Sequence, residues 1–114
     1  MEHRCSVRRS LRFQLMLYRQ GIPVQRAVSR NLGMGGVLVD AGTSKWRKNE
    51  MLEIEFMDAE QRPVMRLPAV VVHQSDGGTG LMFGRVTARQ RHNLRRWLYG
   101  GTGKPVAADT IAVA

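Results

Sequence analysis

The stretch Arg8–Gln20, RRSLRFQLMLYRQ, decides the fold class of this chain. After the first arginines, apolar and polar residues alternate, so that Leu11, Phe13, Leu15 and Leu17 share one face. A period of two indicates a half-buried β-strand, here over residues 11–20. One such strand cannot cover its own apolar face, and so the rest of the chain is expected to supply partner strands.

Five further segments have strand character, and turn residues separate most of them. The turns are expected at GIP (21–23), AEQRP (59–63) and SDGG (75–78), and Pro68 is expected at an edge position or a bulge. The strands are VQRAVSR (24–30), GVLVD (36–40), MLEIEFMD (51–58), VMRLPAVVVHQ (64–74) and TGLMFG (79–84).

One helix is expected in TARQRHNLRRWLYG, residues 87–100. Thr87 and Gln90 form a capping box, and Leu94, Trp97 and Leu98 lie on one stripe. Six short strands and this helix predict an all-β fold, a small six-stranded antiparallel β-barrel with a C-terminal α-helix over an open end or seam. Residues 11–100 would form this domain, with a flexible arm at 1–10 and a flexible tail at 101–114.

Positive charge is concentrated at the two ends of this 114-residue chain, whose net charge is +9. Residues 1–30 carry +6, residues 85–104 carry +6, and residues 31–84 carry −2. Such a field attracts the phosphates of nucleic acid, a lipid surface or a small nucleotide. Charge alone is equally well explained by solubility.

Chemical catalysis is not indicated by the reactive side chains. His3, His73 and His92 lack metal-ligand spacing, and the possible nucleophiles Cys5, Ser10 and Ser29 have no identifiable base. We therefore expect no enzyme, no metal and no cofactor. No apolar run reaches the ~20 residues of a membrane span, and the single cysteine suits a reducing compartment, so a cytoplasmic location is expected.

Two short motifs point to an anionic, guanine-bearing ligand. Arg8 and Arg12 stand four apart in RRSLR, and an arginine fork matches a phosphate and also the O6/N7 edge of guanine. In NLGMGG (31–36), the glycines can adopt φ > 0 and bring backbone N–H groups close to a ligand. Asn31 offers a base edge both a donor and an acceptor.

The order of these motifs resembles the PilZ domain, the bacterial receptor module for cyclic di-GMP. An Arg-x-x-x-Arg motif, a strand, an Asn/Asp-x-Ser-x-x-Gly motif, further barrel strands and a closing helix match roughly residues 4–99. The resemblance implies a ligand site of seven residues. Arg8 and Arg12 would clamp phosphate and base with help from Arg9, Asn31 would read a guanine edge, Gly36 would permit close approach, Gly33 would offer its backbone N–H, and His73 would stack on a base.

One position departs from the family pattern, because Gly33 replaces the motif serine. A hydrogen bond to a charged partner is worth ~1.5–3 kcal/mol, so its loss would weaken binding ten- to a hundredfold. The backbone N–H of Gly33 would compensate in part. Since the arginines are kept, retained binding is predicted.

The resemblance implies a cyclic di-GMP receptor whose N-terminal arm changes conformation on binding and signals to an effector protein. Such a receptor would be a monomer or weak dimer, acting in processes such as motility or biofilm formation. Two alternatives stay open: a PilZ-shaped adaptor that binds protein but no ligand, and a basic β-barrel that binds nucleic acid. The sequence argues against nucleic acid because Phe13, Phe56 and Phe83 fall on inward-facing positions.

Overall fold

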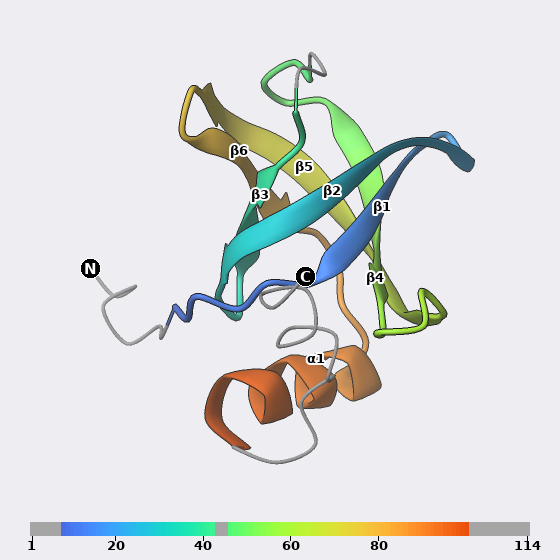
Figure 1. The fold of residues 1–114 in the computed structure, drawn as a ribbon, viewed down its shortest axis with the longest axis vertical. Helices are drawn as coiled ribbons and strands as arrows, with labels where there is room; N and C mark the ends of the chain where they lie inside the picture. The colour runs from blue at the N-terminus through green and yellow to red at the C-terminus, as the bar shows by residue number, and fades with distance from the viewer. Residues whose placement is uncertain (1–7, 43–45, 101–114) are drawn as a thin grey trace.

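Six antiparallel strands close into a barrel in the order β1-β2-β3-β6-β5-β4 in the computed structural model, which describes residues 8–42 and 46–100 (Figure 1). One helix follows the last strand, so the predicted all-β architecture is confirmed. The strands are β1 Gln14–Arg19, β2 Ile22–Leu32, β3 Gly36–Asp40, β4 Met51–Met57, β5 Pro63–Ser75 and β6 Gly78–Phe83; the helix α1 is Ala88–Arg95 and continues as a π-helical turn, η2, Arg96–Gly100.

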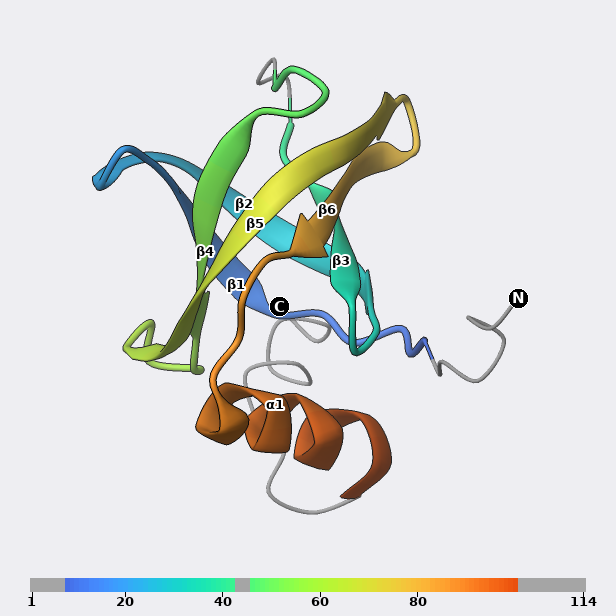
Figure 2. The same ribbon diagram turned by 180° about the vertical axis from the view of Figure 1, so that it is seen from behind.

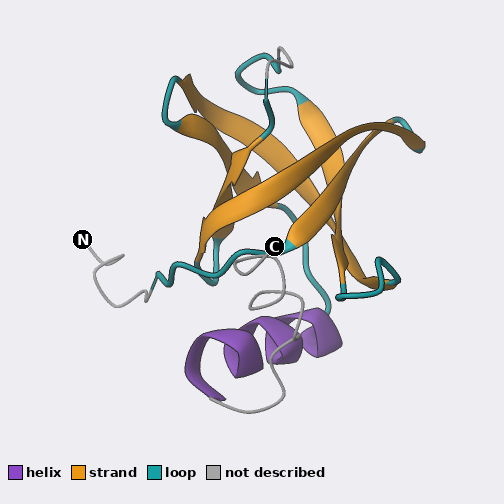
Figure 3. Ribbon diagram, in the orientation of Figure 1, coloured by secondary structure: helices purple, strands orange, loops and turns teal. Residues whose placement is uncertain are grey.

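The helix lies across one end of the barrel (Figures 2 and 3). Trp97 is 3% exposed, and its ring lies 5.0 Å from that of Phe13 and 5.4 Å from that of Phe56, measured between centroids. Both phenylalanines are fully buried inside the barrel. The apolar stripe of the helix therefore closes the barrel, as predicted.

The start of the helix is fixed by the capping box that the sequence predicts. The Gln90 N–H donates to Thr87 Oγ1 at 3.1 Å, and the Thr87 N–H donates to Gln90 Oε1 at 2.9 Å. The Gln90 side chain also donates to the Arg66 carbonyl oxygen at 2.9 Å. One side chain thus caps the helix and ties it to β5.

One detail of the strand prediction is wrong. The first hairpin turns at Gln20–Gly21, which both have positive φ (52° and 81°), so that Ile22 and Pro23 of the predicted GIP turn belong to β2. Pro68 lies at a local edge position, as expected, because it pairs with Glu53 of β4 whereas the pairing of β5 with β6 begins only at Ala69. Its carbonyl accepts from Gly84 just past the end of β6, where the missing N–H of proline removes no ladder bond.

Trp97→Ala should lower the free energy of unfolding by about 3–5 kcal/mol, because it leaves a cavity between the helix and the barrel. Tyr99→Ala, on the same helix, is the matched control: Tyr99 is 52% exposed, and its loss should change stability by less than about 0.5 kcal/mol. Urea denaturation followed by circular dichroism measures both. Similar losses in the two variants would contradict this role for Trp97.

Candidate ligand-binding site

The chain before β1 is held along β2 by backbone hydrogen bonds. The Arg9 N–H donates to the Leu32 carbonyl at 2.9 Å, and the Leu32 N–H donates to the Arg9 carbonyl at 2.8 Å. The predicted arm therefore contacts the barrel over its described part, Arg8–Ser10, whereas residues 1–7 lie outside the described residues.

Ser29 of β2 provides a second attachment, inside the barrel wall. Its buried hydroxyl accepts from the Phe13 N–H at 2.7 Å and donates to the Leu11 carbonyl, while its own N–H donates to the Phe13 carbonyl at 3.0 Å. Arg12 stands between these two bonded residues. The backbone on both sides of this arginine is therefore fixed to β2.

A β-bulge turns two neighbouring polar residues of β2 outward. The β2–β3 pairing shifts between Ser29 and Asn31, so that Arg30 is the extra residue. Ser29 and Leu32 are fully buried, whereas Arg30 is exposed and Asn31 is half-buried. Strict alternation would have sent Asn31 into the core; because of the bulge, both side chains reach the outer surface.

Arg8 and Asn31, one from each predicted motif, meet on this surface. Arg8 donates to Asn31 Oδ1 from Nε at 2.9 Å and from Nη2 at 2.6 Å. Both residues line a hollow of about 390 Å³ over β3, β5 and β6. Its other lining residues are mostly small or apolar: Gly35, Gly36, Val37, Leu38, Val72, Gly80, Leu81 and Met82.

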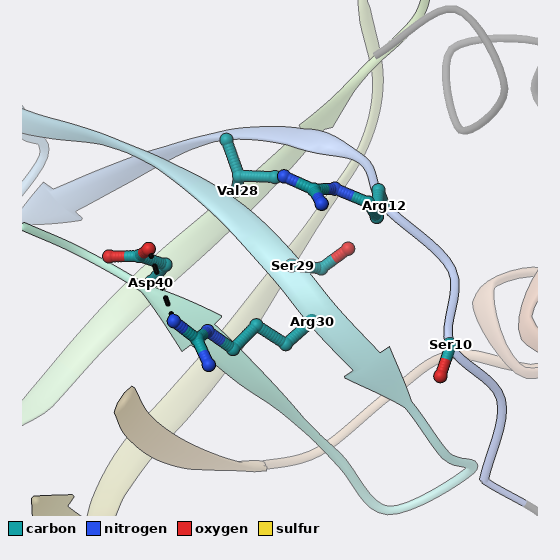
Figure 4. A pocket seen from close by; sticks show the side chains of 6 residues that line it. All are labelled: Ser10, Arg12, Val28, Ser29, Arg30 and Asp40. Carbon is teal, nitrogen blue, oxygen red and sulfur yellow. Dashed lines mark hydrogen bonds and ion pairs between the residues drawn. The ribbon is translucent and has the colours of Figure 1, made fainter. Parts of the chain in front are cut away.

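Arg12 lines a different hollow, of about 440 Å³, with Arg30 and Asp40 (Figure 4). Arg30 Nη2 lies 3.5 Å from Asp40 Oδ2. A hydrogen bond from the Gly42 N–H, and then the guanidinium groups of Arg30 and Arg12, hold the pKa of Asp40 below its ordinary value. Asp40 is therefore a carboxylate at neutral pH, beside two arginines.

Arg9 lines neither hollow. Its Nη1 donates to the Leu98 carbonyl at 2.9 Å, at the C-terminal end of the helical segment, where a positive charge is favourable. The three arginines of the motif thus serve different elements: Arg8 contacts β2, Arg9 contacts the helix, and Arg12 lines the hollow beside β3.

Among the glycines of NLGMGG, Gly36 has a structural role in the barrel that the sequence did not reveal. A Cβ on Gly36 would collide with the Leu81 carbonyl oxygen, because β3 and β6 approach closely there. The Gly33 N–H, expected to face a ligand, donates to the Gly36 carbonyl at 2.9 Å. The expected positive φ is also absent here, since the described glycines with positive φ are Gly21, Gly42 and Gly78.

His73 is exposed on β5 beside the first hollow but does not line it. It pairs with Gly80, and its Nε2 lies 3.1 Å from Ser75 Oγ. A register shift between Val71 and His73 places Val72 at the hollow instead. The stacking role of His73, like the ligand contacts of the other motif residues, stays a prediction.

Sequence reasoning missed Arg30 and Asp40 as site residues. Arg30 precedes Asn31 directly, and Asp40 ends the next predicted strand, but only the β2–β3 pairing brings the two together. Within the described residues, no group of three His, Cys, Asp or Glu side chains could hold a metal ion. Residues 8–42 and 46–100 contain no helix that combines the length and apolar character needed to cross a membrane.

Two hollows on the outer wall of the closed barrel are thus each bordered by an arginine of the docked N-terminal segment. The family model of the PilZ domain matches residues 2–100. The chain therefore belongs to the PilZ family, whose domains are cyclic di-GMP receptors and adaptors.

Solved structures support the fold at low sequence identity. The PilZ domain of CeSA, from a cellulose-synthesizing bacterium, is 18% identical with a TM-score of 0.64, over 82% of this chain and 96% of that chain. The Bacillus subtilis inhibitor of motility MotI/DgrA is 17% identical with a TM-score of 0.69, over 89% of this chain and 51% of that one. No curated protein sequence matches the chain.

Gly36→Ala should destabilise the barrel by about 1–3 kcal/mol, because the added methyl group must push β3 away from β6. Gly35→Ala is the matched control, since a Cβ there meets nothing within 4 Å and Gly35 lacks a positive φ. Thermal unfolding compares the two. If Gly36→Ala were as stable as Gly35→Ala, the close approach of these strands would not explain the glycine.

Ser29→Ala should cost about 1–3 kcal/mol, because the Phe13 N–H loses its buried acceptor. Proteolysis between the arm and β1 should accelerate at the same time. Ser10→Ala, an exposed serine on the same segment, is the control and should behave as the parent protein. An unchanged stability of Ser29→Ala would show that its hydroxyl does not hold the segment.

Proposed function

We propose that this protein is a cyclic di-GMP receptor that signals to an effector protein. The observation that carries the proposal is the Arg8–Asn31 pair, which joins the two predicted motifs at the rim of a hollow. Cyclic di-GMP carries two phosphates and two guanines, and arginine and asparagine side chains suit those groups.

Charge suggests how the ligand is distributed over the two hollows. Arg8, Arg12 and Arg30 are exposed guanidinium groups near the end of β2, suited to phosphate. The carboxylate of Asp40 repels phosphate but accepts from N–H donors, and the guanine N1–H and N2–H groups are such donors. In the proposal the hollow of Arg12 takes a guanine, and the phosphates lie toward Arg8.

The conformational response follows from the present partners of the arm. A phosphate would compete with Asn31 for Arg8, and a rotation of the Arg9 side chain toward the ligand would withdraw it from the Leu98 carbonyl. The Arg9 backbone already pairs with Leu32, so the described part of the arm would exchange side-chain partners rather than become ordered. Release of the helix end is the change that an effector protein would detect.

The substitution of serine by Gly33 bears on affinity. The Gly33 N–H is engaged by the Gly36 carbonyl, so it cannot replace the missing hydroxyl without a local rearrangement. Arg30 adds a guanidinium group to this surface that the family motif does not specify. In the proposal this additional cation offsets part of the loss, and binding is retained.

Isothermal titration with cyclic di-GMP at low salt should give saturable heat for the parent protein at a concentration on the order of 100 μM. Arg12→Ala should weaken binding at least tenfold, because it removes charge-assisted hydrogen bonds, while its melting temperature stays nearly unchanged. Arg62→Ala is the matched control: Arg62 is also exposed, but it lies between β4 and β5 and pairs with Asp58.

Absence of heat with the parent protein would overturn the proposal. Equal heats with cyclic di-GMP and with a single-stranded oligonucleotide of matched phosphate content would instead indicate general phosphate binding. Loss of affinity in Arg62→Ala equal to that in Arg12→Ala would show that net charge, and not the site, determines binding.

A further inference from the structure

Four exposed arginines lie on α1 and η2, and the proposed ligand site does not use them. Arg89, Arg91, Arg95 and Arg96 are all exposed, as are His92 and Arg85 nearby. The sequence has no acidic residue from Gly77 to Gly100. The helical basic face, defined as Arg89, Arg91, Arg95 and Arg96, therefore has no compensating charge of its own.

Only some of these charges oppose helix stability, because Arg95 lies in the last turn of α1, where the helix dipole favours a positive charge. Arg91 and Arg95 are like charges at i and i+4, which repel each other. Arg89 and Arg91 lie in the first turn, where the helix dipole favours acidic residues, and that turn contains none. Helix stability therefore accounts for Arg95 but not for the two arginines of the first turn.

In the barrel, by contrast, most acidic side chains lie close to an arginine. Asp40, Glu50, Glu53 and Asp58 each lie within 4 Å of an arginine, at separations of 2.6–3.5 Å. Among the ion pairs of the described residues, none involves an arginine of the helical basic face. Arg26 and Arg47 are also exposed and form no ion pair within the described residues, but the helix gathers four such arginines within residues 89–96.

The chemistry of the face argues for a lipid surface rather than a protein. Protein interfaces have an apolar or aromatic centre from which charged residues are depleted. Here the apolar stripe of the helix, Leu94, Trp97 and Leu98, is buried against the barrel, and Tyr99 is the one large apolar side chain left exposed on the helix. An anionic bilayer requires only charge on an accessible, extended face.

The shape of the molecule allows such docking. The helix forms the outermost layer at one end of the barrel, so a flat surface can reach it without meeting the strands (Figures 1 and 2). Thirteen residues, Ala88–Gly100, span roughly 20 Å at 1.5 Å per residue. We propose that the helical basic face docks on anionic phospholipid headgroups through arginine–phosphate contacts. This inference is independent of cyclic di-GMP binding.

Co-sedimentation with vesicles of phosphatidylcholine, with or without 30 mol% phosphatidylglycerol (about one lipid in three), tests the proposal. The parent protein should bind only the anionic vesicles, and binding should fall steeply between low and physiological salt. Changing Arg89, Arg91, Arg95 and Arg96 to Gln should reduce the partition coefficient on the order of 100-fold, whereas changing them to Lys should retain most of it.

The matched control removes four charges from the barrel by changing Arg26, Arg47, Lys48 and Arg62 to Gln. It should retain most of the vesicle binding. Melting curves should show the helix Gln variant to be close to the parent in stability, since the relief of Arg91–Arg95 repulsion offsets the lost interaction of Arg95 with the helix dipole. An unstable helix variant would be replaced by single Arg95→Gln and Arg96→Gln variants, each expected to weaken binding several-fold.

Three results would overturn the inference. The first is equal binding of the parent protein to neutral and anionic vesicles. The second is an equal loss of binding in the barrel control and the helix variant, which would make net charge the cause. The third is displacement of the protein from vesicles by duplex DNA at equal phosphate concentration, with tighter binding to the DNA, which would make nucleic acid the occupant of this face.

Discussion

The attachment of the N-terminal segment to β2 through Ser29 is the interaction on which the candidate site depends. The hydroxyl of Ser29 forms hydrogen bonds with the backbone of Leu11 and Phe13, the two neighbours of Arg12. Two backbone hydrogen bonds between Arg9 and Leu32 attach the segment to β2 at a second point. Because the segment contributes only backbone groups to these hydrogen bonds, they do not require its arginine side chains. The bonds thus fix the backbone on both sides of Arg12, whose exposed side chain lines a hollow.

Local irregularities of the barrel then shape the surface under that segment. The bulge at Arg30 turns Asn31 outward to meet Arg8, and the absence of a side chain at Gly36 lets β3 approach β6 so that the floor of the first hollow is continuous. A regular barrel would bury Asn31. Asn31 and Gly36, which the motif predicts as ligand contacts, thus also have structural roles in the wall of the barrel.

The sequence predicted the barrel well because its strands alternate clearly. Phe13, Leu15 and Leu17 face inward as the period of two requires, and Thr87 and Gln90 cap the helix as expected. Turn chemistry was less readable: Gln20, a residue without special turn preference, takes a positive φ that only the hairpin reveals. Arg9 was predicted to bind the ligand, but its side chain bonds the Leu98 carbonyl, 89 positions away. A contact between residues so far apart cannot be predicted from the local sequence pattern.

The candidate site was predicted as a set of residues but not as an arrangement. Arg8 and Asn31 do meet, whereas Arg12 lines a separate hollow with Arg30 and Asp40, because the bulge and the strand pairing decide which side chains share a surface. Motif spacing contains no information on the bulge or on the strand pairing. The role of Gly33 and the placement of His73 are likewise set by pairing across the sheet.

Amide hydrogen exchange of the ligand-free protein tests the central claim most directly, since that claim is that the arginine segment is already fixed on β2. The N–H groups of Arg9, Leu11 and Phe13 all donate within the structure, so they should exchange about 100-fold or more slowly than in an unfolded chain. Exchange of these three amides at the unfolded rate, with the amides of β1 and β4 protected, would show that the segment is not held and would contradict the account.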